Sequence, residues 1–326
     1  MSRKLVLAMT LTIFLIGMLG VALKVQMVEA SGTITINADG SVEGTTDIST
    51  VDNVTYTFTD NINDSIVVER DNIVVDGANY TVQGPGSGTG INLTDRSNVT
   101  IKNMEIKTFD RGIWLDESSN NTISKNNITN NNDDGIYITS SSNNNTISGN
   151  TVTANNDDGI RLSWSSNNTL SGNNASSNKN DGISLSVSSD NNVLSGNTVS
   201  SNKNNGIRLR SSSNNNFTGN NFIDNKQQVY DYSWDNPATP PSINIWDDGA
   251  GKGNYWSDYE EKYPNATEMD GSGIWDTAYD IDENNQDNYP LVPEFPSFLI
   301  LPLFMIATLL AVIAYRRQLK KVNVNT

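Results

Sequence analysis

The sequence predicts an all-β protein, a right-handed single-stranded parallel β-helix of about seven coils with 22–24 residues each. The first observation is the dipeptide Gly-Ile, which recurs every 23 or 24 residues. The second is that two further apolar series keep the same period, which gives three strands per coil. The third is that Asn, Ser and Gly cluster between these series. The Gly-Ile pairs begin at Gly112, Gly135, Gly159, Gly182 and Gly206.

Each predicted strand alternates between two faces. In Gly159-Ile160-Arg161-Leu162 the two aliphatic residues share one face and Arg161 lies on the other. Such short strands cannot bury a face alone, but coils stacked in parallel register form one continuous apolar column. Degenerate coils precede the regular ones, and residues 31–60 are predicted to cap the N-terminal end against aggregation.

The polar segments between strands are predicted to be tight bends, because Asn tolerates the left-handed backbone conformation. One asparagine series keeps the repeat period, and we expect its side chains to form an internal amide ladder, each bonded to the next. The alternative is exposed polar turns in a disordered tract, which rarely keeps three apolar series in phase. The series is Asn103, Asn126, Asn150, Asn173, Asn197 and Asn220.

Both ends of the chain have the composition of membrane-related segments. A basic start, an apolar run from Leu5 to Leu23 and a small-residue pattern ending at Ala30 predict a signal peptide, the alternative being a retained anchor helix. Residues 298–315 are apolar, long enough to span a bilayer and followed by basic residues, which predicts a transmembrane helix with a cytoplasmic tail. The predicted divisions are 1–30 signal peptide, 31–60 N-terminal cap, 61–230 repeats, 231–292 acidic C-terminal cap, 293–315 sorting motif and helix, and 316–326 tail.

Charge and composition exclude several functions. Seven of the 21 Lys and Arg lie in the end segments, so residues 31–292 carry 14 positive and 35 negative side chains, a net charge of −21. This field repels nucleic acid. The absence of His and Cys excludes disulfides, His/Cys zinc or copper sites, and Ser-His-Asp or Cys-His catalysis. Any chemistry must use carboxylates, Lys, Arg, Tyr or Ser.

Past the repeats the chain carries specific sequences, Asn-Ile-Trp-Asp-Asp-Gly at 244–249, Gly-Asn-Tyr-Trp-Ser-Asp-Tyr at 253–259 and Tyr-Pro-Leu at 289–291. With the repeats, they make residues 60–292 resemble the NosD-like family of right-handed β-helix proteins, which shares features with carbohydrate-binding and sugar-hydrolase repeats. The combination is similar to surface proteins of methanogenic archaea. Pro293-Glu294-Phe295 before the terminal helix resembles a sorting signal processed by archaeosortases, which would remove that helix.

The resemblance implies the fold and an extracellular location more than an activity. The family's name is tied to copper delivery for nitrous oxide reductase. This chain has no His or Cys, and five of its seven Met lie in the end segments, so we do not carry copper binding over.

An acidic loop is the candidate metal site. Its oxygen ligands stand at alternate positions, Glu268, Asp270, Ser272 and Asp276, among glycines that permit a tight loop around Ca²⁺. Tyr279 stands at the twelfth position, so the loop is not an EF-hand. The alternative is a solvated acidic turn without an ion.

Two further candidates lie around the Gly-Ile repeat. The bend before it carries Asp133, Asp134, Asp157, Asp158 and Asp181, which stacking would place about 5 Å apart, where they could recruit cations or catalyse. Splayed, solvated charges would give the same pattern. The outward residues beside this bend are Trp114, Tyr137, Arg161 and Arg208, with Trp164 nearby, and could bind a glycan or simply cover the surface.

The sequence therefore favours a non-enzymatic cell-surface protein that binds a polysaccharide or an envelope partner, with Ca²⁺ as the one candidate cofactor. The rival is a polysaccharide lyase or hydrolase that uses the bend carboxylates. A third reading is a structural envelope component without a ligand. Twelve N-x-[ST] sequons are candidate glycan acceptors, although an Asn-rich repeat creates many by chance.

Overall fold

The computed structural model describes residues 32–236 and 239–293. The predicted signal peptide, transmembrane helix, sorting motif beyond Pro293 and basic tail lie outside these residues. In the part of the chain that is described, no helix has the length and apolar character needed to cross a bilayer.

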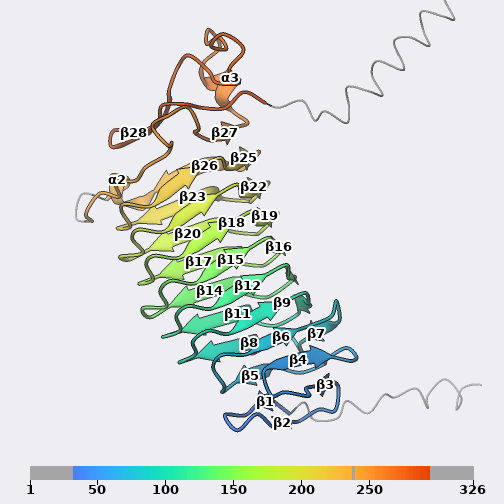
Figure 1. Cartoon of the computed structure of the whole chain (residues 1–326). Coiled ribbons are helices and arrows are strands. Elements are labelled where there is room, and N and C mark those ends of the chain that lie inside the picture. Colours follow the sequence, from blue (N-terminus) through green and yellow to red (C-terminus); the bar gives the residue numbers. More distant parts are fainter. Residues whose placement is uncertain (1–31, 237–238, 294–326) are drawn as a thin grey trace, which may run out of the picture.

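The chain winds into a parallel β-helix whose strands stack along one axis, from the blue N-terminal end to the orange C-terminal end in Figure 1. Three long sheets line the helix, which we call sheets A, B and C. In the described residues sheet C has eight strands, so the helix has about eight turns rather than seven. The difference arises because Tyr255–Trp256, beyond the predicted repeats, adds a strand to sheet C, and strands within residues 31–60 likewise join sheets A and B.

Within the described residues, sheet A contains, in spatial order, β2 (Val42–Glu43), β1 (Ile34–Ile36), β5 (Ile66–Val68), β8 (Thr89–Thr94), β11 (Arg111–Asp116), β14 (Ile136–Thr139), β17 (Ile160–Ser163), β20 (Ile183–Ser186), β23 (Asn205–Arg210) and β26 (Gln227–Asp231). Sheet B contains β24 (Asn216–Thr218), β21 (Val193–Ser195), β18 (Thr169–Ser171), β15 (Thr146–Ser148), β12 (Thr122–Ser124), β9 (Thr100–Lys102), β6 (Val74–Asp76), β4 (Thr55–Phe58) and β3 (Ile48–Ser49). Sheet C contains β27 (Tyr255–Trp256), β25 (Asn221–Ile223), β22 (Thr198–Ser200), β19 (Asn174–Ser176), β16 (Thr151–Thr153), β13 (Asn127–Thr129), β10 (Glu105–Lys107) and β7 (Thr81–Gln83).

The predicted apolar series form the core. Ile113, Ile136, Ile160 and Ile183 pair in register along sheet A and are each fully buried, as are the corresponding residues of sheets B and C. Burying one such side chain stabilises the fold by about 1.5–3 kcal/mol, and each coil buries several of them.

The glycine of each Gly-Ile pair is required by space. A Cβ on Gly159 would lie 2.6 Å from the carbonyl oxygen of Gly182 and 2.7 Å from Nδ2 of Asn178. Because the next coil's backbone occupies the position of a side chain, only glycine fits, and this explains the repeat's most regular feature.

Internal amide ladders satisfy the backbone at the bends. In the predicted series, Nδ2 of Asn150 donates to Oδ1 of Asn173 at 3.0 Å, and the Asn150 backbone N–H donates to the same atom. Two further ladders, absent from the prediction, run beside it, one through Asn121, Asn145, Asn168, Asn192, Asn215 and Asn244, the other through Asn131, Asn155, Asn178, Asn202 and Asn225.

The prediction was wrong for Asn103, which does not join this ladder. Its backbone has φ 55° and its Nδ2 donates to Asp76, while the neighbouring Met104 occupies the ladder position and donates its backbone N–H to Asn126. The cause is one coil with a shorter repeat, because Ile101 pairs with Ile123 only 22 residues away.

Stacked aromatic rings close the C-terminal end. Trp246 stacks on Phe217 with ring centres 4.1 Å apart, and Trp256 lies between Phe222, at 4.6 Å, and Tyr279, at 4.1 Å. Two short helices, α2 (Tyr232–Asp235) and α3 (Tyr259–Lys262), and the antiparallel hairpin of β28 (Tyr279–Asp282) and β29 (Asn285–Asp287) complete this end. The specific sequences around Trp246 and Trp256 are therefore the cover of the open core.

Candidate functional site: a carboxylate ladder beneath an aromatic and arginine face

The bend between sheets C and A brings the predicted carboxylates together on successive coils. Asp134, Asp158 and Asp181 each precede the Gly-Ile of their coil and are each only 1% exposed. Asp133 and Asp157, one residue earlier, are partly exposed. The sequence thus predicted the alignment, but the burial of three of the five side chains depends on what packs over them.

The three buried carboxylates form a hydrogen-bonded column, which we call the carboxylate ladder. The backbone N–H of Asp158 donates to Oδ1 of Asp134 at 3.2 Å, and that of Asp181 donates to Oδ1 of Asp158 at 3.0 Å. Asn205 ends the ladder, donating both its backbone N–H and its Nδ2 to Oδ1 of Asp181. The ladder is thus fixed by main-chain donors, one coil at a time.

Burial changes the proton affinity of the ladder. Burial, and after it the charge of Asp181, raises the pKa of Asp158 to about 7. Burial and then the charge of Asp158 raise the pKa of Asp134 well above its usual value. Burial also raises the pKa of Asp181, against the hydrogen bonds from Asn205. The ladder therefore holds protons at a pH where free carboxylates are ionised.

Arginines cover the ladder from the outward face of sheet A. Nη1 of Arg161 lies 3.8 Å from Oδ2 of Asp134, and Nε of Arg208 lies 4.0 Å from Oδ2 of Asp181. Each arginine reaches back by one coil. Neither contact is a hydrogen bond, because both ladder oxygens lack a hydrogen-bond partner in the described residues.

Aromatic rings and arginines alternate along the same face. Trp114 pairs in register with Tyr137, and Tyr137 with Arg161. The guanidinium of Arg111 lies 5.6 Å from the Trp114 ring centre and 5.3 Å from that of Tyr137, and the guanidinium of Arg161 lies 5.2 Å from that of Tyr137. We call Arg111, Trp114, Tyr137 and Arg161 the stacked face.

Arg111 is a member that the sequence did not single out. It is the first residue of β11 and precedes Gly-Ile, so it does not occupy the outward position that directly follows this dipeptide. Its Nη2 lies 3.1 Å from Oδ2 of Asp133. Its only sequence signal is a basic residue where the following coils carry Asp.

Two predicted binding residues lie apart from the stacked face. Ser184, which is 1% exposed, stands between Arg161 and Arg208 in the register, so Arg208 lies two coils from Arg161. Trp164 follows β17 on a bend with φ 49° and is 54% exposed. The structure therefore brings together three of the five predicted ligand-binding residues and adds Arg111.

Three N–H donors of the stacked face have no acceptor. Nε of Arg111, Nε1 of Trp114 and Nε of Arg161 are buried atoms without a hydrogen-bond partner in the described part of the chain. An unpaired buried donor costs roughly 1–3 kcal/mol. Because these atoms are buried, a ligand could accept hydrogen bonds from them only if the neighbouring side chains moved.

Possible cation ligands occur at the bend. Carboxylate oxygens of Asp133, Asp134 and Asp157 lie within 4.8 Å of one another, and in the described residues no other trio of acidic side chains converges in this way. The trio offers the carboxylate oxygen ligands that a hard cation binds. Arg111 and Arg161 already neutralise part of its negative charge, which weakens its attraction for a cation.

In the predicted Ca²⁺ loop, carboxylate oxygens accept hydrogen bonds from residues in or next to the loop. Asp276 accepts hydrogen bonds from Thr267 and Thr277, and Glu268 accepts one from the backbone N–H of Gly273. Ca²⁺ binding by Glu268, Asp270, Ser272 and Asp276 stays a prediction. A melting temperature that a chelator leaves unchanged would contradict it.

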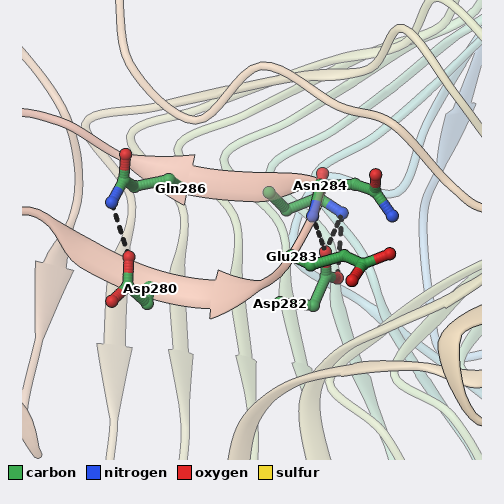
Figure 2. Close-up of a pocket in the computed structure, with 6 residues that line it drawn as sticks. Asp280, Asp282, Glu283, Asn284 and Gln286 are labelled. Atoms are coloured by element: carbon green, nitrogen blue, oxygen red, sulfur yellow. Dashed lines mark hydrogen bonds between the residues drawn. The ribbon is translucent and has the colours of Figure 1, made fainter.

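An acidic hollow of about 540 Å³ lies at the β28–β29 hairpin, lined by Asp280, Asp282, Glu283, Asn284, Asn285 and Gln286. Figure 2 shows that Gln286 bonds across the hairpin to Asp280. Nδ2 of Asn285 also donates to Asp282. The acidic groups thus stabilise the turn of the hairpin itself.

Comparison with known proteins gives the family. The family model described as "Periplasmic copper-binding protein (NosD)" matches residues 25–261. The chain belongs to the NosD family. A search of curated proteins found no match.

Solved structures show the same fold as this NosD-family chain. The periplasmic alginate epimerase AlgG is 20% identical with a TM-score of 0.50 over 59% of this chain, which spans 47% of AlgG. The A-module of the Azotobacter vinelandii mannuronan C-5 epimerase AlgE4 is 14% identical with a TM-score of 0.43, over 59% of this chain and 64% of that one. Pectate lyase Pel9A is 16% identical with a TM-score of 0.36, over 81% and 78%. The likeness to AlgG extends to the parallel β-helix and no further.

The residues of this NosD-family chain do not fit copper. Copper sites in proteins use His, Cys or Met side chains, and the sequence has no His and no Cys. Of the two Met in the described residues, Met104 is buried in the core and Met269 lies in the C-terminal loop. No step involving copper is therefore derived from this chain.

Proposed function

We propose that this protein is an exported, non-enzymatic member of the NosD family that binds polysaccharide along the stacked face of sheet A. The observation that carries the proposal is the alternation of two aromatic rings with two guanidinium groups, all on partly exposed side chains. Sugars present apolar ring faces and oxygen acceptors, the two features that this surface complements.

The rigidity of the face supports binding. Its backbone belongs to paired strands, and stacking holds the arginine side chains before any ligand arrives, so little conformational entropy is lost on binding. The guanidinium groups favour a polysaccharide that carries carboxylates, because they are always charged and match carboxylate geometry.

Polysaccharide cleavage is the second candidate, and the pKa of Asp158 near 7 is the observation that favours it, because a general acid works best near the ambient pH. Asp134, Asp158 and Asp181 are 1% exposed, so a substrate would have to displace Arg161 or Arg208 to reach them. The accessible Asp133 and Asp157 would remain as the reacting pair. Binding requires no such displacement and is therefore the preferred function.

The proposal includes location. The basic and apolar start of the chain and the apolar residues 298–315 with their basic tail support export and tethering at the cell surface, with the β-helix outside. The family description, a periplasmic protein, is compatible with export. The envelope of an archaeal cell, and removal of the terminal helix at Pro293-Glu294-Phe295, belong to the same proposal.

Binding of the purified protein to an array of neutral and uronate-containing polysaccharides tests the function. We expect retention of at least one uronate polymer, and at least about tenfold weaker binding, ~1.4 kcal/mol, by the Trp114→Ala/Tyr137→Ala variant. Thr153→Ala, on the outward face of sheet C, is the matched control and should bind normally. Retention of no polysaccharide, or equal retention by the double variant, would contradict the proposal. Unsaturated products or new reducing ends, lost in Asp133→Asn and Asp157→Asn, would favour cleavage.

A further inference from the structure

One edge of the β-helix carries an exposed asparagine on every coil. At the bend that leads from sheet A into sheet B, each asparagine stands two residues before the first residue of its sheet B strand, is exposed and has φ between 54° and 62°. We call this column the asparagine edge. Its members are Asn53, Asn72, Asn98, Asn120, Asn144, Asn167, Asn191 and Asn214.

Threonines accompany the asparagine edge on most coils. Thr100, Thr122, Thr146 and Thr169 follow four consecutive asparagines by two residues and pair with one another in parallel register. Each side chain points outward on its strand, so asparagine and threonine lie on the same exterior surface. Asn98, Asn120, Asn144 and Asn167 are therefore four N-x-Thr sequons aligned on successive coils, about 4.8 Å apart.

The fold alone does not require asparagine at this edge. The corresponding bend into sheet C has the same left-handed backbone, with φ between 55° and 68°, yet only its first two coils carry asparagine, Asn79 and Asn103, and the later ones carry Lys125, Gly149, Gly172, Gly196 and Gly219. Glycine adopts this conformation at the lowest steric cost. Two bends with one backbone requirement thus use different residues, and the asparagine of the edge needs another explanation.

Hydrogen bonding within the protein does not supply that explanation. Nδ2 of Asn98 donates to Asn72, whereas the hydrogen bonds found for Asn120, Asn144 and Asn167 are donated by their backbone N–H groups. The sequons on strands differ from one another: Oδ1 of Asn174 and Oδ1 of Asn216 are buried and Oδ1 of Asn92 accepts from Thr94, whereas Asn127 is exposed. Asn98, Asn120, Asn144 and Asn167 are all exposed, whereas Asn127 is the only exposed asparagine among these four strand sequons.

We propose that the asparagine edge is an N-glycosylation site, with Asn98, Asn120, Asn144 and Asn167 as acceptors. The co-reactant is a lipid-phosphate-linked oligosaccharide, supplied with its transferase outside the cytoplasm, so this proposal rests on export but not on polysaccharide binding. The amide Nδ2 forms a bond to the anomeric carbon of the first sugar, the bond from that carbon to the phosphate oxygen breaks, and the amide releases one proton as the lipid phosphate leaves.

The edge also contains its own negative controls. Asn191 and Asn214 have the same exposure and backbone, but their coils carry Val193 and Asn216 where the sequon needs Thr. These two asparagines should remain unmodified. Val193 further shows that the strand position accepts valine without loss of the fold.

Peptide mass spectrometry of the full chain purified from its natural cells, before and after chemical deglycosylation, tests the proposal. We expect sugar mass on peptides containing the four acceptors and none on Asn191 or Asn214. Thr146→Val should remove the sugar from Asn144 and Thr146→Ser should keep it, while Val193→Thr should create an acceptor at Asn191. Circular dichroism melting of each variant checks that the fold persists.

Three results would overturn the proposal: unmodified peptides at all four positions, sugar confined to strand sequons such as Asn127, or sugar retained on Asn144 after Thr146→Val. Polysaccharide binding is measured separately on the stacked face. Failure of one proposal therefore leaves the other standing.

Discussion

The carboxylate ladder should make the protein less stable as pH rises, and Asp158→Asn isolates the effect. The folded pKa of Asp158, about 7, lies above its unfolded value of 3.8. The folded state therefore binds more protons than the unfolded state between these values, and the stability that this proton provides is lost as pH rises through 7.

The magnitude follows from the pKa difference. About three pKa units correspond to about 4 kcal/mol at pH 8, when Asp158 must ionise in its buried position. Asparagine removes this cost and fits the site, because its amide oxygen can accept from the Asp181 N–H and Asn205 occupies the corresponding place two coils later. We expect the variant to be more stable than the wild type by several kcal/mol at pH 8 and by little at pH 4.

Urea unfolding followed by tryptophan fluorescence, at half-unit steps from pH 4 to pH 8, measures this difference. Asp95→Asn, on an exposed bend, is the matched control and should give a much smaller difference at pH 8. A variant no more stable than the wild type at pH 8, or a stability difference that does not change with pH, would refute the reasoning about the buried ladder.

Three further predictions concern the fold. Gly159→Ala should destabilise the protein by about 3 kcal/mol, because the new Cβ meets the backbone of the next coil. Gly172→Ala, where the space is open but φ is +61°, should cost about 1 kcal/mol. A comparable loss of unfolding free energy in both variants, measured by urea unfolding, would contradict the steric argument. Asn173→Ala should lower the unfolding free energy by about 3 kcal/mol, because it leaves two donors of Asn150 buried without an acceptor. Asn156 is exposed, and Asn156→Ala should change the unfolding free energy by less than about 0.5 kcal/mol. Equal effects would show that the ladder contributes nothing to stability. Trp246→Ala should lower the unfolding free energy by about 3–5 kcal/mol and promote self-association, because it uncovers the end of the core. Calorimetry would detect the first effect and size-exclusion chromatography the second. An unchanged melting temperature and a single elution peak would show that the Phe217–Trp246 stack is dispensable.

Much of the fold was predictable because a β-helix repeats its local pattern. The Gly-Ile spacing fixed the coil length, and the apolar series assigned inward faces that the buried columns of Ile113, Ile136 and Ile160 confirm. The two additional amide ladders had the same periodic signal as the predicted one. Asn103 was misplaced because a period read from spacing alone cannot locate one shorter coil.

The site was less predictable, because its properties depend on contacts across coils. The sequence by itself determined which residues share a bend or an outward column, since stacking in register follows from the repeat. Only the tertiary structure decided that Asp134, Asp158 and Asp181 are buried, that Arg161 and Arg208 reach back over them, and that Arg111 enters between Trp114 and Tyr137. The physical reason is that burial and electrostatics depend on how long side chains pack across neighbouring coils, a three-dimensional arrangement to which one-dimensional spacing gives no access.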